Sequence, residues 1–352
     1  MRLIGRGWIG TMVLLLGLGL WGCQQDENLP NYTAATQNKQ QGASSSSSSS
    51  GSNGPAVGQD RMLLEGFAHG GGVHIPVLQL GLIEVGQGDC FVVGTPEGKV
   101  YLVDGGPAGA EATVVPLLQR SGVEQLAGVF ITNWNADHTG ALPQILGAFP
   151  CGNVYGPDLK TNTPAENAVR DLLAIKGKTV LPMHAGGIIM LDERVKMEIL
   201  APTTPTERGN LDAVSWINTN SVVLRAIFGD SRILFTSSMS PNEREKLLAT
   251  DTDLRTPVLV LADHGSRRGT DIDLLAKVTP TLVLLSCGSG NAEGTPHAEV
   301  IQALKQRSVS FARTDLQGTI FIRCEENGHI SAQPSRPSET DTTFQPGKVT
   351  PK

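Results

Sequence analysis

Short apolar runs separated by turn residues dominate the chain after residue 75. Gln79–Val85, Cys90–Val93 and Lys99–Val103 are bounded by Gly or Pro, and this pattern predicts a meander of three strands. Apolar residues recur at helical spacing in Ala110–Arg120, whereas Leu126–Thr132 is a continuous apolar run that predicts a buried strand.

The helical period returns in Thr139–Phe149, so a loop is expected at 133–138, directly after the buried strand. Later in the chain, the dipeptide Gly229-Asp230 predicts a tight turn between the strands Ser221–Phe228 and Arg232–Thr236. Further strands are expected at Val258–Ala262, Leu282–Ser286 and Thr319–Arg323, and helices at Asn242–Ala249, Asp271–Ala276 and His297–Gln306. Two β-rich halves that each end in helices predict an α/β (α+β) fold, in which two sheets pack face to face with helices outside.

Both ends of the chain differ from this pattern. Two arginines precede an apolar stretch from Trp8 to Gly22, which is shorter than the roughly 20 residues of a membrane-spanning helix. This layout predicts a signal peptide at 1–23. The Gln, Ser and Gly composition of 24–75 predicts a disordered tether, and 326–352 is expected to be a flexible tail. A single domain at 76–325 remains.

The residues Leu20-Trp21-Gly22-Cys23 resemble a bacterial lipobox. The resemblance implies that Cys23 is acylated and becomes the mature N-terminus, so that the protein is exported and tethered to a membrane by its N-terminal lipid. The alternative is an uncleaved N-terminal anchor.

Composition and cysteine usage narrow the function classes. The formal net charge is −6, so nothing in the whole-chain electrostatics attracts a polyanion, and nucleic-acid binding would depend on a local patch. Beyond Cys23 the cysteines are Cys90, Cys151, Cys287 and Cys324, without any Cys-x-x-Cys pair, which argues against a zinc finger. They are either buried apolar residues or members of one or two disulfides, in a pairing that the sequence does not specify.

Polar residues gather in loops that follow the predicted strands. The motifs, in chain order, are Gly86-Gln87-Gly88-Asp89, Asp104-Gly105-Gly106, Asn133-Trp134-Asn135-Ala136-Asp137-His138, Ser237-Ser238, Asp263-His264-Gly265-Ser266 and Gly294-Thr295-Pro296. In order and spacing, this series resembles the ComEC-type branch of the metallo-β-lactamase superfamily. The resemblance implies a four-layer αββα sandwich and a metal-dependent hydrolase, in a branch associated with DNA phosphodiesters.

Several positions depart from the family pattern. In the family, the loop reads His-x-His/Asp-x-Asp-His, but here Asn133 and Asn135 stand where ligands of the first metal belong. A neutral amide oxygen is a weaker donor than imidazole or carboxylate. Ser237-Ser238 also replaces the motif whose Asp bridges two metals. The resemblance therefore implies at most one ion.

The remaining residues match the second-metal ligands of the superfamily. Asp137, His138 and His264 would hold one Zn²⁺ or another divalent ion such as Fe²⁺, and Asp137 is also the candidate catalytic residue. This assignment takes the second residue of the family's His-His pair as the ligand. If the first is the ligand, Asp263 takes that place. Alternatively, Asp137 and His138 only cap the helix expected from Thr139.

Other polar residues near these motifs are weaker candidates. Asp104 is expected to hydrogen-bond the metal loop from behind. Arg267 either binds a phosphodiester or belongs to a solvated loop. His184 is expected in a surface loop, and His297 either takes the place of a lost ligand or is solvated. Trp134 is expected to crowd the pocket or to stack on a ligand.

Two functions follow. The first is a metal-dependent hydrolase that acts on a phosphodiester, a nucleic acid or a small ester. The second is a catalytically inactive, lipid-tethered binding or assembly module that keeps the fold and needs no metal. A serine hydrolase has no support, because Ser237-Ser238 lies beside no base motif and no Gly-x-Ser-x-Gly sequence occurs. Neither the substrate nor a protein partner can be identified from the sequence.

Overall fold

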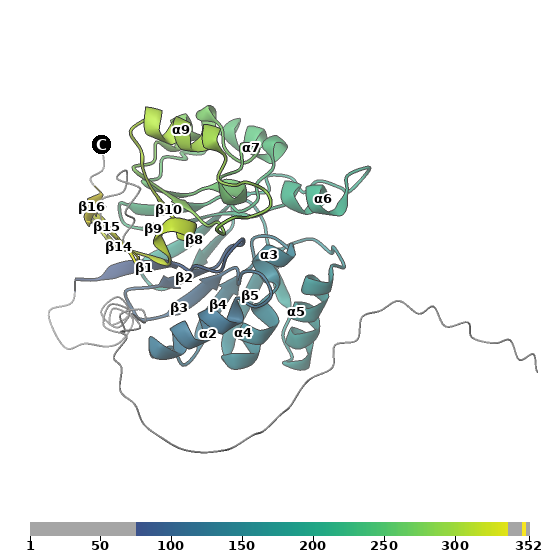
Figure 1. Ribbon diagram of the computed structural model, residues 1–352. Helices are drawn as coiled ribbons and strands as arrows, with labels where there is room; N and C mark the ends of the chain where they lie inside the picture. Colours follow the sequence, from purple (N-terminus) through teal and green to yellow (C-terminus); the bar gives the residue numbers. More distant parts are fainter. Residues whose placement is uncertain (1–74, 337–346, 350–352) are drawn as a thin grey trace, which may run out of the picture. The chain divides into compact units, whose positions relative to one another are not determined.

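The computed structural model describes residues 75–336 and 347–349 (Figure 1). The predictions for the signal peptide, for lipid attachment at Cys23 and for the tether up to residue 74 lie outside the described residues. Within the described part, no helix has both the length and the apolar character needed to cross a membrane.

The first sheet has nine strands in the order β16-β15-β14-β1-β2-β3-β4-β5-β6. The predicted meander is confirmed, because β1, β2 and β3 pair antiparallel. From β3 to β6 the neighbours pair in parallel, so these strands end at the same edge of the sheet. The strands are β1 Val77–Leu82, β2 Phe91–Gly94, β3 Val100–Val103, β4 Leu126–Phe130, β5 Cys151–Pro157, β6 Val180–Met183, β14 Ile320–Glu325, β15 Ile330–Pro334 and β16 Gly347–Val349.

The second sheet has seven strands in the order β13-β12-β11-β10-β9-β8-β7. The hairpin predicted at Gly229-Asp230 joins β9 to β10, and Gly229 has φ 57°, a value that favours glycine. From β10 to β13 the strands pair in parallel. The strands are β7 Ile188–Met190, β8 Val195–Ala201, β9 Val223–Phe228, β10 Ser231–Phe235, β11 Val258–Val260, β12 Leu282–Leu285 and β13 Ser310–Arg313.

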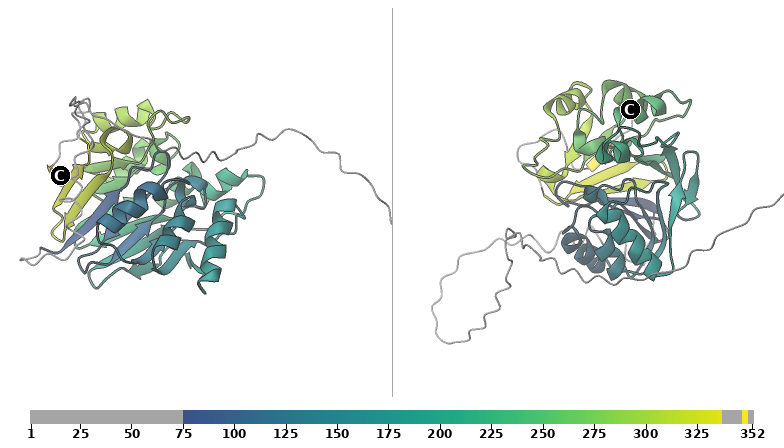
Figure 2. Two further views of the ribbon diagram at one scale, coloured as in Figure 1. Left: turned by 60° about the horizontal axis from the view of Figure 1, so that its bottom comes forward. Right: turned by 90° about the vertical axis from the view of Figure 1, so that its right-hand side faces the viewer.

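Helices cover the outer face of each sheet (Figures 1 and 2). The helices of the first half of the chain are α2 Glu111–Arg120, α3 Ala136–Thr139, α4 Leu142–Ala148 and α5 Pro164–Ile175, of which α2, α4 and α5 cover the first sheet. The helices of the second half are α6 Ala213–Thr219, α7 Pro241–Leu248, the 3₁₀ helix η1 Ala262–Gly265, α8 Ile272–Val278, α9 Ala298–Gln306 and α10 Thr314–Gln317, of which α7, α8 and α9 cover the second sheet.

Three hydrophobic cores separate four layers. One core lies between the sheets and takes alternate residues from both, for example Leu80 of β1 and Leu224 of β9. A second core lies between the first sheet and α2, α4 and α5, and a third joins the second sheet to α7, α8 and α9. Val223, the neighbour of Leu224, belongs to this third core, as the alternation of side chains along a strand requires. The predicted αββα sandwich is confirmed.

Some element boundaries differ from the prediction. The helix expected over 139–149 is two helices, because α3 ends at Thr139 and α4 begins at Leu142. As a result, Asp137 lies in the first turn of α3 and not in a loop. Strand β15 lies beyond residue 325, where a flexible tail is predicted; it pairs with β14 and buries Ile330. That part of the tail prediction is wrong.

Each of the four cysteines in the described part of the chain is unpaired. Cys90, Cys287 and Cys324 are buried, and Cys151 is half-buried. Burial raises the pKa of Cys324 to about 12. Of the two alternatives that the sequence leaves open, the structure supports apolar core residues and not disulfides.

Candidate active site

Loops from both sheets meet at one edge of the sandwich, where β1, β3, β4, β10, β11 and β12 end. Hydrogen bonds join these loops across the two sheets. Thr132 Oγ1 lies 2.7 Å from Ser237 Oγ, and Ser286 Oγ donates to Gly88 O at 2.6 Å. The fold therefore brings together the motifs that the sequence distributes over some two hundred residues.

Asp104 holds the loop that follows β4. It comes directly after β3 with φ 56°, and its side chain is fully buried. Its carboxylate accepts hydrogen bonds from Thr132 N at 2.8 Å, from Thr132 Oγ1, and from His138 Nδ1 at 2.9 Å. Burial raises the pKa of Asp104 above its ordinary value, although His138 opposes this effect. Asp104 thus fixes the orientation of the His138 ring.

His138 is fully buried in α3, and its second ring nitrogen points toward two other groups. Nε2 lies 2.9 Å from Ser238 Oγ and 3.8 Å from Asp137 Oδ2. Burial opposes protonation of the ring, but the carboxylates of Asp137 and Asp104 outweigh it and raise the pKa of His138 to about 9. His138 therefore contacts Asp104 through Nδ1 and both Ser238 and Asp137 through Nε2.

His264 approaches Asp137 from the second sheet, in η1, where the backbone has φ 54°. Its Nδ1 lies 2.9 Å from the Ser286 carbonyl oxygen, which can only accept, so Nδ1 carries the hydrogen. Its Nε2 lies 3.2 Å from Asp137 Oδ2. Against the effect of burial, the two imidazoles lower the pKa of Asp137 to about 2, and the carboxylates of Asp137 and Asp89 raise the pKa of His264.

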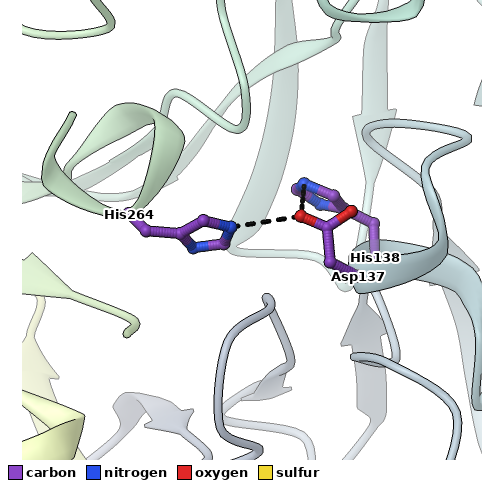
Figure 3. Close-up of side chains that lie close together, drawn as sticks. All are labelled: Asp137, His138 and His264. Carbon is purple, nitrogen blue, oxygen red and sulfur yellow. Dashed lines mark hydrogen bonds and ion pairs between the residues drawn. The ribbon is translucent and has the colours of Figure 1, made fainter. Parts of the chain in front are cut away.

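These three side chains form a group that can bind a metal ion (Figure 3). One donor atom from each of Asp137, His138 and His264 lies within 4.8 Å of the other two. Both histidines have Nδ1 fixed by an acceptor and Nε2 near the Asp137 carboxylate. This arrangement of imidazoles held by partners behind them is typical of protein metal sites.

Asp89 is a member of the cluster to which the sequence analysis assigned no role. It is buried, and its carboxylate lies 3.8 Å from His138 Nδ1 and 3.5 Å from His264 Nδ1. With Asp104 and His138 it forms a second group of potential ligands. Its position after Gly88, in a loop at the same edge of the sheet, is the signal that could have identified it.

Asn133 and Asn135, in the loop after β4, have their side-chain amides hydrogen-bonded to other residues of the chain. Asn133 is fully buried, donates to Ser221 Oγ at 2.7 Å and to Asn218 Oδ1 at 3.1 Å, and accepts from Asn135 N at 2.7 Å. Asn135 Nδ2 donates to the same Asn218 oxygen at 2.7 Å. Both amides therefore connect the loop to the region of α6.

Trp134, between these asparagines, does not reach the pocket. Its side chain is fully buried in the core between the first sheet and its helices, where the Arg170 guanidinium lies 4.9 Å from the ring centre. The expectation that Trp134 crowds the pocket or stacks on a ligand is wrong. Successive side chains along an extended loop point to opposite sides, so the direction of the two asparagines sends the indole into the core.

A cavity of about 630 Å³ adjoins the cluster and is lined by Ser238, Asp263, Arg267 and His297, among others. Asp137, His138 and His264 are not part of its lining. Arg267 lies 3.6 Å from the exposed Glu299, and its backbone N–H donates to His297 Nδ1 at 3.2 Å. His184 is exposed beside Asp158 at 3.8 Å, as expected for a surface residue.

The sequence does not indicate the contact between Ser238 and His138, because no base motif lies near Ser237-Ser238 along the chain. The two residues are 100 positions apart, and they meet because β4 and β10 belong to different sheets whose ends face each other. The histidine beside Ser238 thus comes from the other half of the chain, so no local sequence motif contains both residues.

Residues 83–275, more than half of the chain, match the sequence profile of the metallo-beta-lactamase superfamily, and the chain belongs to this superfamily. Within it, the chain is similar to ComEC-type proteins. It is 23% identical over 276 residues to ComE operon protein 3 of Bacillus subtilis (strain 168), a match that covers 73% of this chain and 34% of that protein. It is 27% identical over 251 residues to Competence protein ComA of Neisseria gonorrhoeae, covering 71% of this chain and 33% of that protein. The chain thus spans about a third of the length of these relatives.

Among solved structures, the Zn²⁺-bound PqqB of Methylobacterium extorquens matches 64% of this chain and 85% of that chain, with 12% identity and a TM-score of 0.45. The family prediction made from the loop motifs is confirmed by the sequence comparisons. Proteins of this fold typically bind divalent metal, and this chain has groups that can supply the ligands.

Proposed function

We propose that the protein is a hydrolase that uses one divalent metal ion, with Asp137, His138 and His264 as ligands and a phosphodiester as substrate. The convergence of Asp137, His138 and His264 carries the proposal. Nδ1 of His264 donates to a carbonyl, so Nε2 is the ring atom that faces the Asp137 carboxylate, 3.2 Å from Oδ2. His138 Nε2 lies 3.8 Å from the same oxygen, and the three donor atoms lie within 4.8 Å of one another.

The donor set fits such an ion. One carboxylate and two imidazoles match the ligands that Zn²⁺ and Fe²⁺ prefer, and they leave positions open. A bound divalent ion would supply Lewis acidity at neutral pH. Residues of the chain orient the ligands. Asp104 holds the His138 ring and Ser286 O holds the His264 ring in one tautomer, and Asp89 adds negative charge behind both rings.

One ion per chain is proposed, and not two. The positions of the first ion's ligands are occupied by Asn133 and Asn135, whose amides are engaged by Asn218 and Ser221. Where the family has a bridging carboxylate, Ser238 offers a hydroxyl. Neutral oxygens attract a second cation less than imidazole or carboxylate donors and offset less of its loss of hydration.

The substrate class rests on the relatives and on the edge of the cavity. One relative is named Competence protein ComA, and the loop motifs resemble those of a branch associated with DNA phosphodiesters. Arg267 and Arg268 line the cavity beside the cluster and supply local positive charge on a chain of net charge −6. A nucleic acid or a smaller phosphodiester would bind at this edge.

Metal analysis of the purified full-length chain tests the ligand set. After incubation with Zn²⁺, Mn²⁺ or Fe²⁺ and removal of free ions, the protein should retain one ion per chain. Asp137→Ala and His264→Ala should lose it, whereas His184→Ala, a histidine variant on the exposed surface, should keep it. Equal metal content in wild type and His264→Ala would contradict the proposal.

Activity is measured on bis(4-nitrophenyl) phosphate and on single-stranded DNA. The metal-loaded protein should hydrolyse one of them, and Arg267→Gln should raise KM more than it lowers kcat, because Arg267 contacts substrate and not the ion. Arg120→Gln, on the exposed face of α2, is the matched control.

The second candidate is a binding or assembly module without metal chemistry. It is favoured by the hydrogen bond between Ser238 Oγ and His138 Nε2, which engages a ligand atom with a protein group. Metal content far below one ion per chain under all three conditions would select this function.

The proposal also includes the exported, lipid-anchored state. It is supported by the apolar stretch that ends in Leu20-Trp21-Gly22-Cys23. Cells that express the full chain with an alkyne fatty acid should incorporate the label and place the protein in the membrane fraction. Cys23→Ser should abolish both, and persistence of the label in this variant would contradict acylation at Cys23.

A further inference from the structure

We propose that, in the metal-free chain, Ser238, His138 and Asp104 form a nucleophilic triad that hydrolyses small carboxylic esters. Ser238 Oγ lies 2.9 Å from His138 Nε2, and His138 Nδ1 lies 2.9 Å from Asp104 Oδ2. A nucleophile within hydrogen-bond reach of a base, itself oriented by a third group, is the geometric signature of covalent catalysis by serine.

The third member of the triad is rigidly placed. The Asp104 carboxylate is fully buried and receives two hydrogen bonds from Thr132, one from the backbone and one from the hydroxyl. In the neutral ring, a carboxylate held in this way directs the Nδ1 hydrogen of His138 toward itself and leaves the Nε2 lone pair for the serine. The tautomer that general-base catalysis needs is therefore built into the fold.

Ser238 is the member that a substrate can reach. It follows β10 in a turn where Ser237 has φ 49°, and it lines the cavity of about 630 Å³, whereas His138 does not. Ser237 cannot take this role, because its hydroxyl lies 2.7 Å from Thr132 Oγ1. A pocket of this size accommodates a small ester.

An amide donor lines the same cavity. Asn218 accepts on Oδ1 from both Asn133 and Asn135, while its Nδ2 donates to no group in the described part of the chain. This leaves Nδ2 available for the negative oxygen that develops when an ester carbonyl is attacked. Asn133 and Asn135 thus set the orientation of the Asn218 amide.

The reaction balances without a co-reactant other than water. Ser238 Oγ bonds to the carbonyl carbon while its proton passes to His138 Nε2, and the ester C–O bond then breaks as that proton moves to the departing alkoxide. Water attacks the acyl-serine by the same route, giving the carboxylic acid and the free hydroxyl. Asp104 stays ionised and only positions the ring.

This activity and metal binding exclude each other at one atom. The Nε2 lone pair of His138 either accepts the Ser238 hydroxyl hydrogen or ligates an ion. Zinc should therefore suppress the serine reaction in proportion to the occupancy of the site. This competition separates the triad from the metal-dependent function proposed above, because either can fail alone.

Covalent labelling of the full-length, metal-depleted protein with a small fluorophosphonate is the test. The serine oxygen bonds to phosphorus, fluoride leaves, and the labelled peptide is identified by mass spectrometry. Labelling is run at about pH 7 and at about pH 10. The expected product is one label per chain, on Ser238, together with hydrolysis of 4-nitrophenyl acetate.

Variants provide the controls. Ser238→Ala should remove the label, and His138→Gln should slow labelling by about 10²-fold or more. Ser215→Ala is the matched serine control, because Ser215 lines the same cavity but donates to Asp212 at 2.6 Å and has no histidine partner. It should label like wild type.

Because wild type itself reports the labelled residue, the test does not depend on the folding of a variant. No label on Ser238 at either pH, or an equal rate in His138→Gln, would overturn the triad, whether or not the chain binds metal. A label on Ser238 that zinc does not suppress, in a chain that binds zinc, would support the triad and remove His138 from the proposed ligands.

Discussion

At the scale of single residues, the substituted metal positions contribute hydrogen bonds to the fold. Asn133→Ala removes an amide that contacts Ser221, Asn218 and the Asn135 backbone inside the protein. Buried partners left without a hydrogen bond cost about 1–3 kcal/mol. We expect the free energy of unfolding to fall by about that amount while the metal content stays the same, as measured by urea denaturation and metal analysis.

The control for this prediction is Asn153→Ala, an exposed amide on β5 whose change should stay within about 0.5 kcal/mol. A stable Asn133→Ala protein that had lost its ion would show instead that Asn133 is a ligand.

Residue type and order were sufficient to select Asp137, His138 and His264, because the motifs that contain them resemble those of a known family. They did not predict that the Trp134 side chain lies in the core or that Asp89 lies beside the two histidines. A sequence pattern gives the identity of a side chain but not its direction, and in the loop after β4 neighbouring residues point to opposite sides. Asp89 was missed because its partners come from α3 and η1 and not from its own loop.

At the scale of elements, the sequence predicted many of those with a clean period and missed several others, not all of them irregular. The strands β1 to β4 and helix α2 follow apolar runs with glycine or proline boundaries. β5 contains Gly152, Gly156 and Pro157, residues that usually end a strand. β8 was missed although Val195–Ala201 alternates between buried and half-buried positions, which is the pattern of a strand.

Helix α5 provides a prediction of pH-dependent stability. Glu166 is buried in its first turn and accepts hydrogen bonds from Thr161 N and Oγ1, both at 2.6 Å, and from Arg170 Nε at 2.6 Å. Although burial opposes ionisation, these donors lower the pKa of Glu166 in the folded protein. A lowered pKa gives stability that is present above the unfolded-state pKa of about 4.3 and is lost as the pH falls through the folded-state value.

Glu166→Gln should therefore lower the free energy of unfolding by about 1–3 kcal/mol at about pH 7, and by less at about pH 3. Urea denaturation at the two pH values measures the difference. Glu124→Gln, at an exposed position, should show almost no effect. A loss that is the same for Glu166→Gln at both pH values would argue against an ionised carboxylate as its cause.

Gly140 lies between α3 and α4 and packs closely against neighbouring backbone. A Cβ atom there would lie 2.6 Å from Ala136 O and would also clash with Ala108 N. Gly140→Ala should cost about 1–3 kcal/mol in unfolding free energy and displace α3, which carries Asp137 and His138. Metal affinity should fall with stability. Gly147→Ala, in α4, is the control, since a Cβ at Gly147 meets no atom within 4 Å. Unchanged metal affinity in Gly140→Ala would show that α3 tolerates the displacement.

At the scale of the whole molecule, the site is a property of the two sheets together. The sequence predicted which loops lie at strand ends, and the carboxyl ends of parallel strands share an edge. It did not predict which loops of one sheet meet which loops of the other. The contact between Ser238 and His138 depends on that packing, which the core between the sheets determines through residues such as Phe91 and Phe235. This is why a serine mechanism had no support before the fold was known.

The same packing predicts that ion binding stabilises the whole fold. Asp137 and His138 follow the first sheet, while His264 follows the second, so an ion held by all three would connect the two halves of the sandwich. An ion present at about 100 times its Kd that binds only the folded state adds about 2.7 kcal/mol to the free energy of unfolding.

The unfolding temperature should therefore rise as zinc is added to the metal-depleted chain, and it should return to its original value after chelation. His264→Ala leaves two ligands on one sheet, so the shift should vanish, whereas His184→Ala should retain it in full. An equal shift in both variants would mean that the ion binds elsewhere, since only His264 joins the second sheet to the proposed site.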